Sequence, residues 1–154
     1  MKFHIENSKI NGAINLLSQL SLKGTNSRHR SKMIKALSTH LKEVGDDEKE
    51  ILKQHCRLDE HGEPKKTADG RAWDVKDLKT FVKDRDELYA EKLILEGGKA
   101  WGYLRTVKDI LLECEMEWSG ADAEIYDYLC DEFERIEEEG LQEETKEESE
   151  EKSA

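Results

Sequence analysis

The sequence predicts a predominantly α-helical α+β fold with about five amphipathic helices and at most a small sheet. Three observations lead to this prediction. Apolar residues recur at spacings of three, four and seven along most of the chain, a period typical of helices that bury one face. One proline and ten glycines in 154 residues leave few interruptions to helices. Residues 1–5 and 93–95 carry the alternation or the short apolar run of a strand.

The longest predicted helix spans residues 27–58, and the rest of the fold is organised around its apolar stripe. The stripe consists of Met33, Ile34, Leu37, Leu41, Val44, Ile51, Leu52 and Cys56. Gly45 interrupts the pattern, but the step from Val44 to Ile51 keeps the apolar residues on one face. A break would shift that phase, so we expect one continuous helix that contains Gly45 at a cost of about 1 kcal/mol.

The segments on either side of this helix follow from their own local signals. Residues 1–5 alternate as a strand, and Asn7 or Ser8 is the expected cap of the helix that follows. That helix should end near Gly24, which can adopt the left-handed cap conformation. Residues 58–70 form a turn and a polar loop.

The second half of the chain begins with a helix for which Asp74 is the expected cap, with Trp73 packing on Leu78 as a hydrophobic staple. Residues 93–95 then form a short strand that pairs with residues 3–5, because an isolated strand cannot satisfy its backbone. Two amphipathic helices follow.

The apolar pattern stops after Ile136. Residues 1–138 are therefore expected to form a single helical domain, and residues 139–154 an acidic tail that is mobile and disordered. The tail has too few apolar residues to offset the entropy of ordering.

Charge is distributed very unevenly along the chain, whose formal net charge is −11. Residues 1–42 contain eight Lys and Arg residues against one Glu, and residues 109–154 contain nineteen Asp and Glu residues against three basic ones. Such asymmetry indicates charged partners. The candidate acidic face consists of Asp122, Glu124, Asp127, Asp131 and Glu134. The alternative basic face consists of Arg28, Arg30, Lys32 and Lys35.

Several segments together resemble a family of uncharacterised small proteins encoded by phages and prophages of Gram-positive bacteria. These are the opening Met1–Lys9, Leu22–Gly24 with Ser27–Arg30, Leu58–Pro64, Glu96–Gly98, Leu104–Lys108 and Ala123–Cys130. The resemblance covers roughly residues 1–135 and leaves out the acidic tail. It implies a small phage-encoded accessory protein and assigns no activity, ligand or functional residue.

The patterns that catalysis or cofactor binding requires are weak. The sequence contains no Walker phosphate loop, and Gly97-Gly98 is too little for a dinucleotide fingerprint. His55, Cys56 and His61 lie close in sequence without metal-ligand spacing, so we expect no metal and no cofactor. Three cysteines without paired spacing favour reduced thiols in the cytoplasm of a host cell, and the N-terminus lacks the apolar core of a signal peptide.

The leading hypothesis is a non-enzymatic phage accessory protein that acts on a host or phage protein. One form of it is an inhibitor of a defence or nucleic-acid-binding protein, whose acidic face imitates the charge of nucleic acid. The alternatives are nucleic-acid binding through the basic face and a role as a virion or assembly component that forms homo-oligomers. No apolar run approaches the length of a membrane span, so a membrane partner is not expected.

Overall fold

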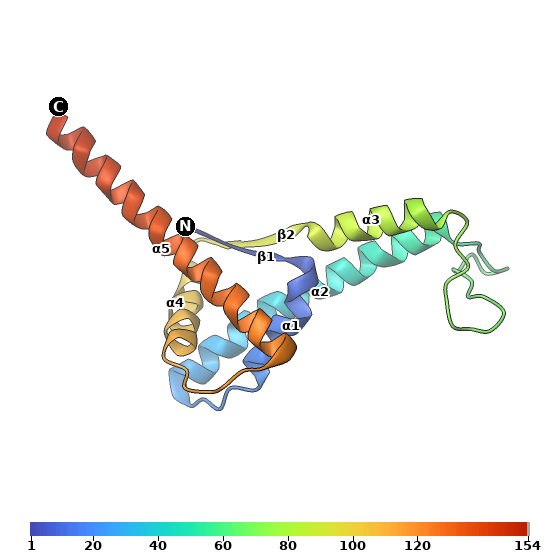
Figure 1. Cartoon of the computed structure of the whole chain (residues 1–154), viewed down its shortest axis with the longest axis horizontal. Coiled ribbons are helices and arrows are strands. Elements are labelled where there is room, and N and C mark those ends of the chain that lie inside the picture. The colour runs from blue at the N-terminus through green and yellow to red at the C-terminus, as the bar shows by residue number, and fades with distance from the viewer. Residues whose placement is uncertain (154) are drawn as a thin grey trace.

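The computed structural model describes residues 1–153 and has the predicted α+β fold, predominantly helical (Figure 1). These residues form five α-helices and two β-strands. In chain order they are β1 (Lys2–Glu6), α1 (Asn7–Ser18), α2 (Gly24–His55), α3 (Leu78–Ala90), β2 (Lys92–Glu96), α4 (Gly98–Leu112) and α5 (Gly120–Ser153). None of these helices combines the length and the apolar composition that a bilayer crossing requires.

The two strands pair in an antiparallel ribbon, which confirms the predicted pairing of residues 3–5 with residues 93–95. The register places Lys2 opposite Glu96, Phe3 opposite Leu95, His4 opposite Ile94, Ile5 opposite Leu93 and Glu6 opposite Lys92. Side chains alternate between the two faces of a strand, so Phe3 and Ile5 point into the core while His4 lies on the opposite face.

One large core occupies the body of the molecule, which consists of β1, β2, α1, α4, α2 up to residue 43 and α5 up to residue 139. The helices contribute one apolar stripe each, as their periodicity predicts. Leu37, Leu111 and Leu129 are fully buried in this core. Leu41, on the same predicted stripe as Leu37, is half-buried at the edge of the core.

The second half of α2 leaves the body and packs against α3, forming a projecting arm of residues 44–90 (Figure 1). The arm has a small core of its own, built from Leu52, Cys56 and Phe81. The predicted continuous helix is confirmed, because α2 runs through Gly45 without a break. A Cβ at that position would meet no neighbouring segment within 4 Å, so close packing does not require a glycine there.

The start of α3 differs from the prediction. Asp77, not Asp74, caps the helix, and its side chain accepts hydrogen bonds from the backbone N–H groups of Lys79 and Thr80. Residues 56–77 form short antiparallel bridges, and the Asp74 backbone N–H donates to the Lys65 carbonyl. The Asp74 carboxylate accepts from Arg57 at 2.6 Å. The Asp74 carbonyl, which would accept the first hydrogen bond of a helix, instead accepts the Arg57 backbone N–H at 2.9 Å.

The predicted hydrophobic staple is also wrong, because Trp73 and Leu78 are both exposed. Instead, the Lys66 ammonium lies over the Trp73 ring, 5.2 Å from its centroid. The bridge between residues 66 and 73 holds the two side chains on the same side of the loop.

Asn7 joins the arm to the body and does not cap α1, contrary to the prediction. The α1 N-cap is Glu6, which makes no capping side-chain hydrogen bond. Asn7 is buried, and its Nδ2 donates to the Leu88 carbonyl at 2.8 Å. Its Oδ1 lies 2.8 Å from His40 Nε2 on α2. A buried amide satisfied on both sides fixes the end of α3 against the body.

The C-terminal segment is helical through Ser153, so the prediction of a disordered tail over residues 139–154 does not hold for its secondary structure. Ala154 lies outside the described residues. Beyond half-buried Gly140, every described side chain of this segment is exposed. Glu, Gln and Lys are strong helix formers, so a helix can extend without burying an apolar face.

Candidate interaction surface

Helix α5 contacts β1, α1 and α4 and divides its side chains among three faces. Its apolar face buries Leu129, Phe133 and Ile136 in the body. Phe133 packs on Phe3 of β1, with ring centroids 4.9 Å apart. The two remaining faces are polar, and they differ in whether their charges have partners.

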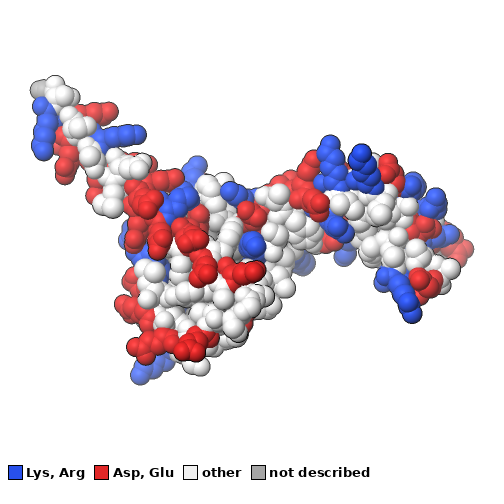
Figure 2. Space-filling view, in the orientation of Figure 1, with Lys and Arg blue, Asp and Glu red and all other residues white. Residues whose placement is uncertain are grey.

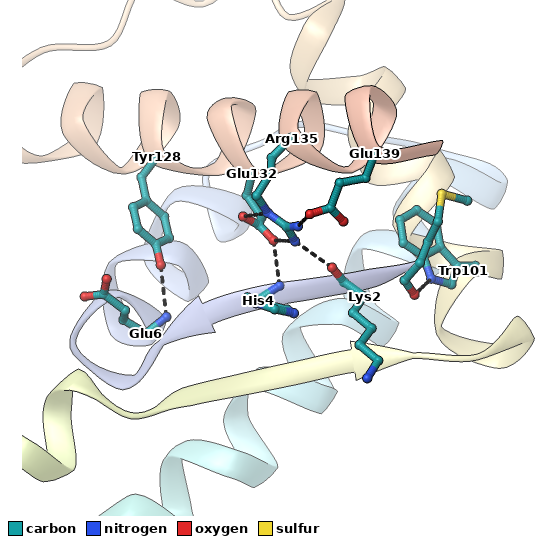
Figure 3. A network of polar contacts seen from close by, with 9 residues as sticks. Lys2, His4, Glu6, Trp101, Tyr128, Glu132, Arg135 and Glu139 are labelled. Carbon is teal, nitrogen blue, oxygen red and sulfur yellow. Dashed lines mark hydrogen bonds and ion pairs between the residues drawn. The ribbon is translucent and has the colours of Figure 1, made fainter. Parts of the chain in front are cut away.

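The polar face of α5 that adjoins its apolar face covers the outer edge of β1 (Figure 3). Glu132 Oε1 accepts the His4 backbone N–H at 2.8 Å, and the Tyr128 hydroxyl accepts the Glu6 backbone N–H at 3.0 Å. Arg135 Nη2 donates to the Lys2 carbonyl at 2.8 Å. These side chains take the place of a third strand, because they satisfy backbone groups of β1 that point away from β2.

Arg135 also neutralises the carboxylates on this face. Its guanidinium donates to both oxygens of Glu132 and to Glu139 Oε1. Hydrogen bonding to Glu132 is the main reason that the pKa of Arg135 is raised, so its charge persists. Glu137 pairs with Lys108 of α4 at 2.7 Å. Glu132, Glu137 and Glu139 therefore each have a cationic partner.

The side of α5 opposite its apolar face carries Glu124, Asp127, Asp131 and Glu134, here called the acidic stripe. Spacings of three, four and three residues place them within about 80° of the helix circumference. All four are exposed, and none of them forms an ion pair or a side-chain hydrogen bond within residues 1–153. In Figure 2, acidic side chains gather over α5 and the adjoining part of the body.

Asp122, the fifth residue of the predicted acidic face, does not belong to the stripe. A separation of two residues places it about 160° around the helix from Glu124. It is half-buried, and its Oδ2 accepts from Gln19 Nε2 of α1 at 3.3 Å. Helical geometry alone excludes Asp122 from this face.

The predicted basic face is incomplete because Arg30 has a structural role. Its Nη1 donates to the Leu17 carbonyl at 2.9 Å and to the Leu20 carbonyl at 2.7 Å, next to the C-terminus of α1. The Leu17 carbonyl also accepts the Leu20 backbone N–H at 3.3 Å. A cation at a helix C-terminus meets the negative end of the helix dipole. Arg28 donates to Thr25 and is exposed, as are Lys32 and Lys35.

The sequence did not single out the residues that hold α5 against β1. Tyr128, Glu132 and Arg135 are separated by four and three residues, a spacing that predicts only a shared helix face. Nothing in that spacing distinguishes an internal pair from a surface pair. The acidic stripe has the same kind of spacing, and only the packing of α5 decides which carboxylates remain free.

The histidine and cysteine candidates are engaged separately. His55 Nε2 lies 2.5 Å from Asp84 Oδ2 on α3, and Cys56 is buried in the arm, where burial raises the pKa of its thiol. His61 is exposed in the loop. In the part of the chain that the structure describes, no group of three or more His, Cys, Asp and Glu side chains is placed to hold a metal ion.

Comparisons of the chain with protein-family models, curated proteins and solved structures find no match.

Proposed function

We propose that this protein is a non-enzymatic interaction protein that binds a basic surface of a partner protein through the acidic stripe of α5. One observation carries the proposal. On the same helix, Glu132, Glu137 and Glu139 are neutralised by Arg135 or Lys108, whereas the four carboxylates of the stripe have no cationic partner within residues 1–153. An unpartnered row of like charge costs self-repulsion, and a cationic partner removes that cost.

The surrounding charge supports this proposal. Residues 109–154 contain nineteen acidic and three basic residues, so a negative potential extends beyond the stripe itself. Such a field accelerates encounter with a cationic surface, and close contacts then determine how long the complex lasts. A basic groove that binds nucleic acid has the opposite charge and would therefore complement the stripe.

The biological setting is part of the proposal. The resemblance to small phage-encoded proteins favours a phage accessory protein whose partner is a host or phage protein. In its most specific form, the protein inhibits a host defence or nucleic-acid-binding protein by occupying its basic groove. The basic-face alternative loses support from the structural role of Arg30, because three exposed cations then remain of the four proposed.

The test is affinity capture from a lysate of phage-infected host cells, with quantitative mass spectrometry. The test variant is Asp127→Asn with Asp131→Asn and Glu134→Gln. Its matched control is Glu143→Gln with Glu147→Gln and Glu150→Gln, which removes the same charge from the exposed end of α5. We expect the stripe variant to lose a basic partner that the wild-type protein and the control retain.

Two further measurements sharpen this test. The association rate with the captured partner should fall as salt rises, because the Debye length shortens from about 10 Å at 0.1 M to about 3 Å at 1 M. The variant Arg28→Ala with Lys32→Ala and Lys35→Ala should bind like the wild-type protein. If that variant loses the partner while the stripe variant keeps it, the proposal is wrong and the basic face is the working surface.

A further inference from the structure

The outer edge of β2 is an unpaired strand edge. In an antiparallel ribbon, only alternate residues direct their backbone N–H and C=O groups at the neighbouring strand. His4 and Glu6 donate their N–H groups to α5, away from β2. Their register partners on β2 are Ile94 and Lys92, which therefore direct their own backbone groups away from β1. The same alternation applies to Glu96.

The structure leaves this edge uncovered. No backbone hydrogen bond to Lys92, Ile94 or Glu96 from the outer side is found within residues 1–153, and all three residues are exposed. The Ile94 side chain, at the centre of the edge, is 46% exposed. Figure 3 shows the contrast, since α5 covers the edge of β1 while β2 lies on the far side of the ribbon. A free edge of this kind is a template for another strand.

We infer that the β2 edge pairs with the β2 edge of a second copy of this chain, forming a continuous four-stranded antiparallel sheet. The sequence Lys92-Leu93-Ile94-Leu95-Glu96 is complementary to itself when it runs antiparallel. A two-fold axis through Ile94 places Lys92 opposite Glu96 of the second copy and Ile94 opposite its own counterpart. Each of these three pairs exchanges two backbone hydrogen bonds, because all three residues direct their groups outward.

The charges select this register across the whole sheet. Lys2 already pairs with Glu96 across the ribbon, at 3.7 Å. In the dimer, Glu96 would next meet Lys92 of the second copy, which is itself opposite Glu6 of that copy. The row of side chains Lys2, Glu96, and Lys92 and Glu6 of the second copy therefore alternates in charge over four strands. Opposite charges on directly facing residues stabilise a sheet. A shift by two residues in either direction would separate Lys92 from Glu96 and place one of them opposite Ile94 of the second copy.

The dimer edge and the acidic stripe lie apart, so the two surfaces can act independently. The order across the sheet is α5, β1, β2, and the second copy adds to the far side of β2. The net charge of −11 on each copy opposes association at long range, whereas the pairs at the edge are in contact. The dimer should therefore strengthen when salt screens the long-range repulsion.

The test measures molar mass by sedimentation equilibrium at about 0.15 M salt, where the Debye length is about 8 Å. The wild-type chain should shift with concentration from 17.8 kDa towards twice that mass. Lys92→Glu alone places two carboxylates opposite each other, and Glu96→Lys alone places two ammonium groups opposite each other. Each variant should dimerise at least about tenfold more weakly than the wild-type protein.

Mixing the two variants restores both ion pairs. The glutamate introduced at position 92 of one copy then faces the lysine introduced at position 96 of the other, and the unchanged Glu96 of the first copy faces the unchanged Lys92 of the second. The mixture should form a heterodimer more tightly than either variant associates with itself. Both variants keep a strongly negative net charge, so non-specific attraction does not account for such a result. Lys79→Glu, on an exposed position of α3, makes the same charge change away from the edge and should dimerise normally.

Circular dichroism of each variant checks that the fold is retained after substitution of an exposed residue. A mass of 17.8 kDa at every concentration up to the millimolar range would overturn the inference. So would a dimer that Lys92→Glu and Glu96→Lys both leave unchanged, or a mixture that associates no better than its components. If the edge instead pairs with an extended peptide of another protein, the chain alone stays monomeric and the inference is overturned.

Discussion

The arm and the C-terminal part of α5, residues 140–153, both project from the body (Figure 1). The arm consists of two antiparallel helices that share a small core of Leu52, Cys56 and Phe81. The end of α5 has no such core. Its side-chain hydrogen bonds, from Thr145, Ser149 and Ser153, all return to carbonyls three or four residues earlier in the same helix.

The difference shows two ways to build a projecting helix. The arm depends on tertiary contacts, because α2 and α3 each supply the apolar partner of the other. The end of α5 depends on intrinsic helix propensity. Its contacts to the rest of the chain cease near Gly140, where an added Cβ would lie 3.8 Å from Met1 Sδ. Substitutions should therefore have effects that decrease from the body to the arm and then to the end of α5.

The largest loss of stability should follow Leu37→Ala in the body. Leu37 is fully buried in the large core, and the surrounding helices can close the resulting cavity only in part. We expect a loss of about 2–5 kcal/mol in the free energy of unfolding, measured by chemical denaturation. A loss below about 0.5 kcal/mol would mean that this face of α2 is assigned wrongly.

An intermediate effect should follow Phe81→Ala in the arm. Phe81 is buried in a cluster of three residues, so its removal should open the arm while the body stays folded. The loss in global stability should be smaller than the loss of about 3–5 kcal/mol typical of Phe→Ala in a large core, because only the arm opens. Amide hydrogen exchange should accelerate in residues 46–55 and 78–90 but not in α4. Equal acceleration in α4 would show that arm and body unfold as one unit.

The smallest effect should follow deletion of residues 140–154. The described part of this segment has exposed side chains and hydrogen bonds that stay within it. The free energy of unfolding should therefore change by less than about 0.5 kcal/mol, while the helical signal in circular dichroism decreases. A loss above about 1 kcal/mol would instead indicate that the end of α5 packs on the body.

The sequence predicted those parts of the fold that depend on local periodicity. The apolar stripe of α2 stayed in phase across Gly45, and the structure has one helix there. The alternation at residues 1–5 and the apolar run at residues 93–95 predicted the ribbon. Of the acidic face, four of five residues lie on one stripe, and the fifth, Asp122, fails by helical geometry that was already available in the sequence.

Only the tertiary structure decided the outcome where two local signals compete, or where a charged side chain of one element binds another element. Asp74 and Asp77 are both good helix caps, and Asp77 caps α3 because the carbonyl of Asp74 already accepts the Arg57 N–H in the loop. The role of Arg30 depends on how α1 ends beside α2.

The same holds for the charges of α5. Glu132 and Asp131 are adjacent acidic residues, yet one accepts a backbone N–H of β1 and the other faces solvent. The sequence determined which residues share a helix face, since that follows from a fixed turn of about 100° per residue. Only packing determined which face meets another element, because that depends on contacts between segments more than a hundred residues apart, such as His4 and Glu132.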